Sequence, residues 1–281
     1  SRMTATLTEP PAPPEAPAPA VAPAPAARPA GFWRDVRSVA GRAVRSLPRE
    51  PEFLLPAILI PAFFYAVNIG ALQDVAEQQP GLDFKAFQLP VAIIFAVTGL
   101  SRATMLALDI QGGYFEKLLI TPTRRSALLL GLMVADVVLV LSLSSLVVAM
   151  GHLVGVRFAT GITGVLAFLL LSTAWGLAFT GFPYAAALRT GNPAAVNTAF
   201  LLFFPFAFLT SALLPVESLT GWMQTVAVWN PVTDLLDGMR SLVLEGWVAA
   251  DLMKAVAAVV GVGALSFTLA MGGLRKRVAR G

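Results

Sequence analysis

Residues 113–125 read Gly-Tyr-Phe-Glu-Lys-Leu-Leu-Ile-Thr-Pro-Thr-Arg-Arg and separate two apolar runs, each long enough to cross a bilayer. On a helix, the apolar and the charged side chains of this stretch fall on opposite sides: Tyr114, Phe115, Leu118 and Leu119 against Glu116 and Lys117. Thr121-Pro122 breaks the helix, and two arginines follow. A plain turn between two spans needs only a few polar residues. The pattern therefore predicts a short docking helix over 110–125.

The overall composition points to a membrane protein with several spans. Of the 281 residues, 57% are hydrophobic and 13% charged, and the mean hydropathy is +0.75. The chain has no cysteine and a single histidine, His152, so disulfides and the usual zinc sites are excluded and His152 is expected at the membrane interface. The formal charge of +4 comes from basic residues at the edges of apolar runs, which argues for membrane topology and against a nucleic-acid partner.

The chain divides into a tail and a membrane domain. Residues 1–30 are almost wholly Ala and Pro and are expected to be disordered, whereas 31–281 form the predicted domain. Within it, residues 31–50 space apolar side chains at helical intervals with arginines between them, as in a basic helix lying on the membrane surface. Six predicted spans follow, at 53–72, 89–108, 126–153, 161–188, 196–214 and 255–274. The predicted fold class is all-α.

The distribution of basic residues predicts the orientation. With the N-terminus inside, 15 lysines and arginines lie in inner segments and four in outer segments, with Arg102 inside a span. Both termini and residues 110–125 are therefore predicted to be cytoplasmic, in a bacterial inner membrane.

The outer segment 215–251 is unusual. It holds two short half-apolar pieces separated by Asn230-Pro231, neither long enough to span a bilayer. Such pieces predict a re-entrant helical hairpin in the outer leaflet, with its tryptophans at headgroup depth: Trp222, Trp229 and Trp247.

Two regions carry a family resemblance. The first is 113–125, with its Leu-Leu-x-Thr-Pro core and Gly131 soon after. The second begins with Phe-Pro-Phe-Ala-Phe-Leu-Thr-Ser at 204–211 and continues through Leu214-Pro215, Trp222-Met-Gln, Trp229-Asn-Pro-Val-Thr and Gly238-Met-Arg240. In these features, residues 31–281 resemble the type-2 ATP-binding-cassette export permeases, and most of all the daunorubicin-resistance type.

The resemblance implies a six-span membrane subunit that pairs with a second copy of itself or a homologous permease. Separate cytoplasmic ATPase subunits would bind ATP and Mg, and the complex would export a hydrophobic drug or lipid-like substrate. The sequence itself has no Gly-x-x-x-x-Gly-Lys-Ser/Thr phosphate loop, so we expect a non-enzymatic subunit without a cofactor. The pattern alone favours a solvated face for Glu116 and Lys117. The resemblance implies instead that the whole segment contacts a partner, and that Thr121-Pro122 sets the angle between the docking helix and the third span.

Two charged residues are expected within the spans. Asp136 lies about ten residues, or roughly 15 Å, into the third span, where an unpaired carboxylate is costly. One hypothesis pairs Asp136 with Arg102 of the second span; a proton relay is the alternative. Arg102 could instead extend to the inner interface, leaving Asp109 exposed.

The fifth predicted span carries a phenylalanine cluster around Pro205: Phe200, Phe203, Phe204, Phe206 and Phe208. Such rings more often face lipid or a neighbouring helix, but in an exporter they could line an apolar substrate path.

Three other functions were considered. An ion-coupled secondary transporter usually shows internal repeats and midplane ionisable sites, and Asp136 is the only candidate for such a site. The polysaccharide- or glycolipid-exporting branch of the same family is a further alternative. An intramembrane enzyme is disfavoured, because the chain contains neither His-Glu-x-x-His nor Gly-x-Ser-x-Gly.

Overall fold

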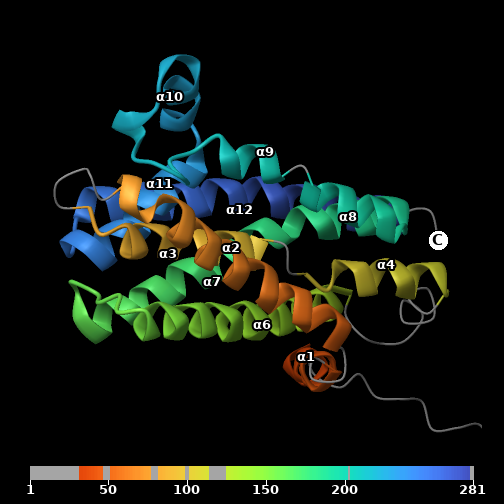
Figure 1. Cartoon of the computed structure of the whole chain (residues 1–281). Helices are drawn as coiled ribbons and strands as arrows, with labels where there is room; N and C mark the ends of the chain where they lie inside the picture. The colour runs from red at the N-terminus through yellow and green to blue at the C-terminus, as the bar shows by residue number, and fades with distance from the viewer. Residues whose placement is uncertain are drawn as a thin grey trace, which may run out of the picture.

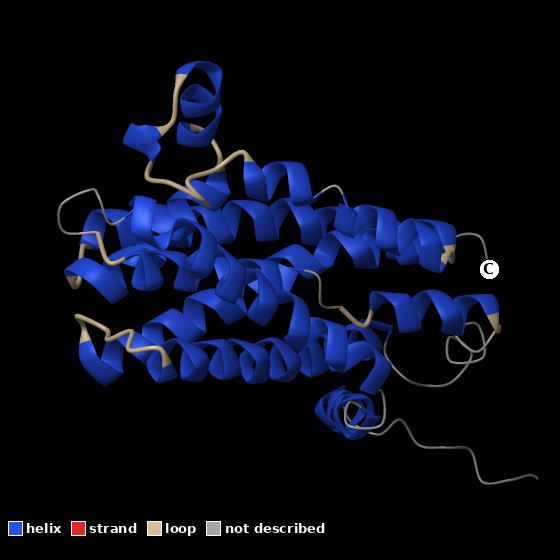
Figure 2. Ribbon diagram, viewed as in Figure 1, coloured by secondary structure: helices blue, strands red, loops and turns tan. Residues whose placement is uncertain are grey.

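The computed structural model describes residues 32–46, 51–76, 82–98, 101–113, 125–201 and 203–278. Within these ranges the elements are helical, and the longest run side by side in one bundle (Figures 1 and 2). The predicted all-α membrane fold is confirmed. The predicted tail 1–30 lies outside the described residues.

Among the described residues, five helical stretches are long and apolar enough to cross a membrane. Four of them match predicted spans: α2 (Pro51–Ala76), α6 (Arg125–Leu153), α7 (Gly161–Thr190) and α12 (Ala249–Val278). The fifth, Phe84–Gln111, covers the predicted second span.

The second span differs from the prediction because it is broken. α3 (Phe84–Thr98) ends before Ser101 and Arg102, which are not helical, and α4 (Ala103–Gln111) begins after them. The break leaves the first main-chain N–H groups of α4 without partners inside the helix, so side chains must supply the acceptors.

The predicted fifth span, 196–214, also takes a different form. α8 (Pro193–Leu201) and α9 (Phe203–Phe208) are short apolar helices, and the chain bends from Leu209 onward. Thr210 stabilises the bend: its hydroxyl donates to the Ala207 carbonyl at 2.6 Å and accepts from the Ala212 N–H at 3.1 Å. The count of six spans therefore stays a prediction.

α1 (Phe32–Ser46) lies within the predicted surface helix 31–50 and is seen nearly end-on in Figure 1, across the direction of the bundle. It packs on α6, with Ala40 buried and Val44 half-buried. Its basic side chains Arg34, Arg37 and Arg45 are exposed. The helix thus presents an apolar face to the bundle and a basic face outward.

The segment after α9 contains the two short helices predicted for 215–251. They are α10 (Gly221–Val228) and α11 (Pro231–Arg240), preceded by a single 3-10 turn at Val216–Ser218 and followed by a π-helical turn, η3 (Ser241–Glu245). Asn230 caps α11 by accepting from the Val232 N–H at 3.0 Å, and its amide donates to the carbonyls of Phe206 and Leu209. Asn230 therefore ties α11 to α9. The re-entrant depth of the hairpin stays a prediction.

The apolar interior consists of two main clusters. The α3 core includes Ile93, Val97, Leu143, Phe168 and Leu235. The α4 core includes Ala103, Leu106, Leu132, Leu188, Val196 and Leu274. In Figure 1 the α4 core lies toward the end of the bundle that holds α4 and α8, hereafter the α4 end, and α11 lies toward the opposite end, hereafter the α11 end.

Candidate functional site

The carboxylate of Asp136 on α6 lies inside the bundle and has no exposed surface. One of its oxygens, Oδ1, accepts from the main-chain N–H of Arg102 at 2.9 Å. The other, Oδ2, accepts from the Tyr184 hydroxyl on α7 at 2.7 Å. We call Asp136, Tyr184 and the Arg102 main chain the polar centre.

The polar centre provides hydrogen-bond acceptors for main-chain N–H groups at the break between α3 and α4. Asp136 accepts from the N–H of Arg102, and the Ser101 hydroxyl accepts from the N–H of Ala103 at 3.1 Å. A negative charge at a helix N-terminus is also stabilised by the helix dipole. On α3, the last residue, Thr98, accepts from the indole N–H of Trp175 at 3.0 Å. Both sides of the break are therefore joined to α7.

The structure brings Arg102 and Asp136 together, as the sequence hypothesis expected. The hydrogen bond comes from the Arg102 main chain, which that hypothesis had not considered, and the side-chain ion pair stays a prediction. Arg102 is buried rather than extended to an interface. The proton relay also stays a prediction; within the described ranges no group of three His, Asp or Glu side chains could hold a metal ion.

The predicted phenylalanine cluster is only partly assembled. Phe203, Phe204 and Phe208 of α9 all contact Phe95 of α3, with ring centroids 6.2, 6.0 and 5.3 Å away. Phe203 is buried and also meets Phe179 of α7 at 5.0 Å.

The other two rings stand apart from this contact set. Phe206 is exposed, and Phe200 is half-buried between the two cores. On the other side, Phe64 of α2 contacts Phe95 at 5.2 Å and Phe208 at 6.3 Å. Phe95 is therefore the centre of an aromatic surface shared by α2, α3 and α9.

A second buried charge, Arg240, lies at the end of α11. Its guanidinium donates to the Phe87 carbonyl at 3.3 Å and to the Ser211 hydroxyl and carbonyl at 2.7 and 2.6 Å. It also pairs with Asp237 at 3.4 Å and lies 3.6 Å from the Phe87 ring centroid. Arg240 therefore joins α11, α3 and the bend after α9.

α11 lies outside the five stretches long enough to span a membrane. Burial raises the pKa of Asp237 above its usual range, and the neighbouring Arg240 opposes that shift. Burial lowers the pKa of Arg240, and Asp237 opposes that shift in turn.

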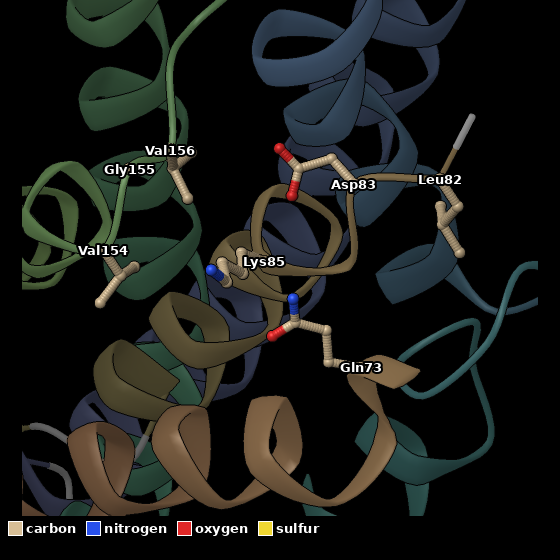
Figure 3. A pocket seen from close by; sticks show the side chains of 7 residues that line it. All are labelled: Gln73, Leu82, Asp83, Lys85, Val154, Gly155 and Val156. Carbon is tan, nitrogen blue, oxygen red and sulfur yellow. The ribbon is translucent and has the colours of Figure 1, made fainter. Parts of the chain in front are cut away.

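An open pocket of about 640 Å³ lies at the α11 end, between α2, the start of α3 and the turn after α6. Figure 3 shows the side chains that line it: Gln73, Leu82, Asp83, Lys85, Val154, Gly155 and Val156. Its one carboxylate is already engaged, because Asp83 accepts from the Ala86 N–H at 3.1 Å and so caps α3.

The predicted docking residues 114–122 lie outside the described residues: Tyr114, Phe115, Glu116, Lys117, Leu118, Leu119, Thr121 and Pro122. The structure describes both flanks. α4 ends at Gln111 and is followed by Gly113 with a φ of 69°, and α6 begins at Arg125. The predicted docking residues therefore lie in the chain between α4 and α6.

This arrangement has known counterparts. The family model for the ABC-2 type transporter matches residues 34–244. The chain belongs to the ABC-2 type transporter family.

Two similar proteins are named for drug resistance. The chain is 26% identical over 208 residues to the daunorubicin resistance ABC transporter permease protein DrrB1 of Streptomyces coeruleorubidus, covering 72% of each chain. It is 26% identical over 205 residues to the probable doxorubicin resistance ABC transporter permease protein DrrC of Mycobacterium tuberculosis, covering 70% of this chain and 72% of that one.

A third match is more partial. The chain is 25% identical over 171 residues to the probable multidrug ABC transporter permease YbhR of Escherichia coli K12, covering 59% of this chain and 46% of that one. Together these matches show an ABC-2 permease subunit, a multi-pass membrane component.

Three parts of this ABC-2 permease were not found by sequence reasoning. Tyr184 and Phe95 gave no signal, because a tyrosine or phenylalanine inside an apolar run looks like any core residue. Arg240 did give a signal in the sequence, because it is a charged residue within a half-apolar stretch that ends in Leu242, Val243 and Leu244. His152, expected at an interface, is exposed near the end of α6 and stacks on Phe158 at 5.7 Å.

Proposed function

We propose that this permease subunit exports a hydrophobic, aromatic drug or a lipid-like molecule, powered by separate cytoplasmic ATPase subunits that bind ATP and Mg. The observation that carries the proposal is the aromatic surface around Phe95. Similar proteins are named for resistance to daunorubicin and doxorubicin, which are flat polycyclic compounds. Stacking against such a ring system suits phenylalanines that are partly exposed, as Phe204, Phe206 and Phe208 are.

The substrate path would run along α9 and α2. α2 is the least buried of the five spanning stretches, because only 11% of the residues in its most apolar part are buried. Many of its exposed side chains are large and apolar, among them Leu55, Leu59, Ile60, Phe63 and Val67. The face formed by α2 and α9 is therefore available to both a substrate and a partner.

The partner proposed for this face is a second copy of the chain or a homologous permease. The exposed apolar side chains of α2 support a partner, because a neighbouring subunit can pack closely against such a face within the membrane.

The proposed orientation puts both termini and the α4 end in the cytoplasm of a bacterial inner membrane. Basic side chains gather on the elements at that end: Arg34, Arg37 and Arg45 of α1, Arg189 of α7, and Arg275 and Lys276 of α12. Such a concentration is typical of the inner side of a membrane protein.

Coupling is proposed to pass through the segment 114–122, and two of its leucines provide the test. A docking helix places a few apolar anchors in its partner's groove, so changing both Leu118 and Leu119 to Ser should release the ATPase subunit and abolish ATP-dependent export. Copurification and daunorubicin transport in proteoliposomes measure both effects.

The matched control is Lys117→Ala, which removes a charge from the same segment and should retain most binding and transport, because a single surface charge contributes little to binding. Normal export by the double-Ser variant would contradict the coupling role. Transport by the wild type on a proton gradient without ATP would favour the secondary transporter instead.

A further inference from the structure

The helix α4 has an unusual position in the bundle. It follows α3 in the chain, yet its side chains belong to a different core: Leu106 and Ala107 pack in the α4 core, whereas Ile93 and Val97 of α3 pack in the α3 core. α4 is thus separated from α3 both by the break at Ser101–Arg102 and by its packing.

The first turn of α4 is held by hydrogen bonds to neighbouring spans. Asp136 of α6 accepts from the Arg102 N–H, and the same carboxylate accepts from Tyr184 of α7. Hydrogen bonds to a carboxyl group in a dry interior are strong, and no water competes for them at a residue without exposed surface. The start of α4 is therefore fixed to α6 and α7 together.

The last turn of α4 contacts a different part of the bundle. Ile110 lies so close to the turn between α7 and α8 that a Cβ on Gly191 would come within 2.7 Å of its side chain. Val196 of α8 is buried in the same core as Ile110. α8 leads directly into α9, which carries Phe203, Phe204 and Phe208.

We propose that α4 is a lever between the docking segment and the substrate surface, and that Asp136 is the positioning residue that holds its pivot. A rod held at one end rotates when it is pushed at the other. α4 has nine residues, a length of about 13 Å. A push at residues 111–113 would therefore move Ile110 against the α7–α8 turn and displace α8 and α9. Without the pivot, the same push would shift α4 alone.

This inference rests on the proposed function for its consequence in transport, but its geometry can be tested without an ATPase. The chain has no cysteine, so spin labels attach only where cysteines are introduced. One pair joins α4 to α6, through exposed Leu108 and Leu146; a reference pair joins α6 to α7, through Leu146 and Leu166. Distances would be measured by pulsed electron resonance on the purified permease in lipid.

Three variants should separate the effects. Asp136→Leu removes the acceptor and should broaden the α4–α6 distances while leaving the reference pair unchanged. Asp136→Asn keeps an acceptor for the Arg102 N–H and should retain the wild-type distances. Tyr184→Phe removes one of the two hydrogen bonds to Asp136, so the breadth of its α4–α6 distances should lie between those of Asp136→Asn and Asp136→Leu. The matched control is Ser144→Ala, which removes a buried α6–α7 contact with Ser172 that does not involve α4.

In the complex with its ATPase, the amount of daunorubicin moved per ATP hydrolysed tests the lever itself. Asp136→Leu should lower this ratio about fivefold or more, with Asp136→Asn close to wild type and Ser144→Ala unchanged. A loss of stability alone would lower both rates together and leave the ratio in place.

The proposal is overturned if Asp136→Leu keeps the wild-type α4–α6 distances, or if it broadens both label pairs, since Asp136 would then hold no pivot or would hold the whole bundle. It is also overturned if the α4–α6 distances broaden but the ratio stays at the wild-type value. A wild type that binds no ATPase would contradict the proposed function, whereas the distances measured on the permease alone would still decide whether Asp136 holds α4.

Discussion

At the scale of single residues, two of the buried ionisable side chains, Asp136 and Arg240, bind main-chain groups. Asp136 accepts from the first N–H of a broken span, and Arg240 donates to the Phe87 and Ser211 carbonyls. Asp136 thereby satisfies a main-chain N–H at the start of α4 that has no partner within the helix, and such a group costs several kcal/mol if it remains unpaired in an apolar setting. Arg240 instead joins the first turn of α3 to the bend after α9, through the Phe87 and Ser211 carbonyls.

Arg240 offers the sharpest test at this scale. Lysine keeps the positive charge but cannot reach three elements with a planar fork or stack on the Phe87 ring, so Arg240→Lys should destabilise the protein by about 2–4 kcal/mol. Thermal unfolding of the purified protein in detergent should show a lower midpoint. Arg275→Lys, at an exposed position of α12, is the control and should leave the midpoint unchanged. Equal midpoints for the two variants would show that the guanidinium contacts carry little stability.

At the scale of helices, close approach depends on small residues. A Cβ on Gly181 of α7 would come within 2.6 Å of the main-chain carbonyl carbon of Ser266 on α12, and the Ser266 hydroxyl donates to the Ala178 carbonyl. Small residues allow membrane helices to pack in this way, and hydrogen bonds between helices add to the attraction. The α7–α12 pair is therefore held by backbone proximity as well as by large side chains.

Gly181→Ala tests this contact. The added methyl group meets main-chain atoms that cannot move independently, so it should force α12 away and destabilise the bundle by about 1–3 kcal/mol. Gly261→Ala in α12 is the matched control, since a Cβ there has nothing within 4 Å, and it should be neutral or slightly stabilising through better helix propensity. Both are read out by thermal unfolding. A stable Gly181→Ala protein would mean that the two helices separate easily.

Sequence reasoning located most of the helices because hydropathy reports the length of an apolar run. It could not locate the break after α3, although Gly99 and Ser101 lie there, because a membrane helix tolerates both residues when neighbours satisfy its backbone. That condition depends on Asp136, 34 residues further along the chain. The bend after α9 was missed for a similar reason: Pro205 was noted, but Asn230, whose amide donates to the Phe206 and Leu209 carbonyls, lies more than 20 residues further along the chain. Long-range partners decide where these helices end.

At the scale of the whole molecule, the two cores and the basic end describe a bundle with two different halves. The α4 end carries most of the described basic side chains, and the α11 end carries the hairpin with exposed Trp222 and Trp229. This asymmetry is what an inner and an outer side require.

The topology is testable by cysteine labelling, since the chain has no cysteine of its own. A membrane-impermeant maleimide should label Glu217→Cys and Glu245→Cys in intact cells, because both positions are exposed at the proposed outer side. Asn192→Cys and Arg275→Cys, exposed at the α4 end, should react only after the cells are permeabilised. The reverse pattern would place the docking segment outside and contradict an ATPase partner in the cytoplasm.

The packing of α1 on α6 has a consequence for how the protein is made. A ribosome delivers the N-terminus first at about 5–20 residues per second, and 78 residues separate the end of α1 at Ser46 from the start of α6 at Arg125. For about 4–16 seconds, therefore, α1 exists without the helix it will pack against. During that time it depends on its own affinity for the bilayer surface, which exposed Trp33 and its arginines can provide. The basic face of α1 thus has a use during synthesis, before the bundle exists.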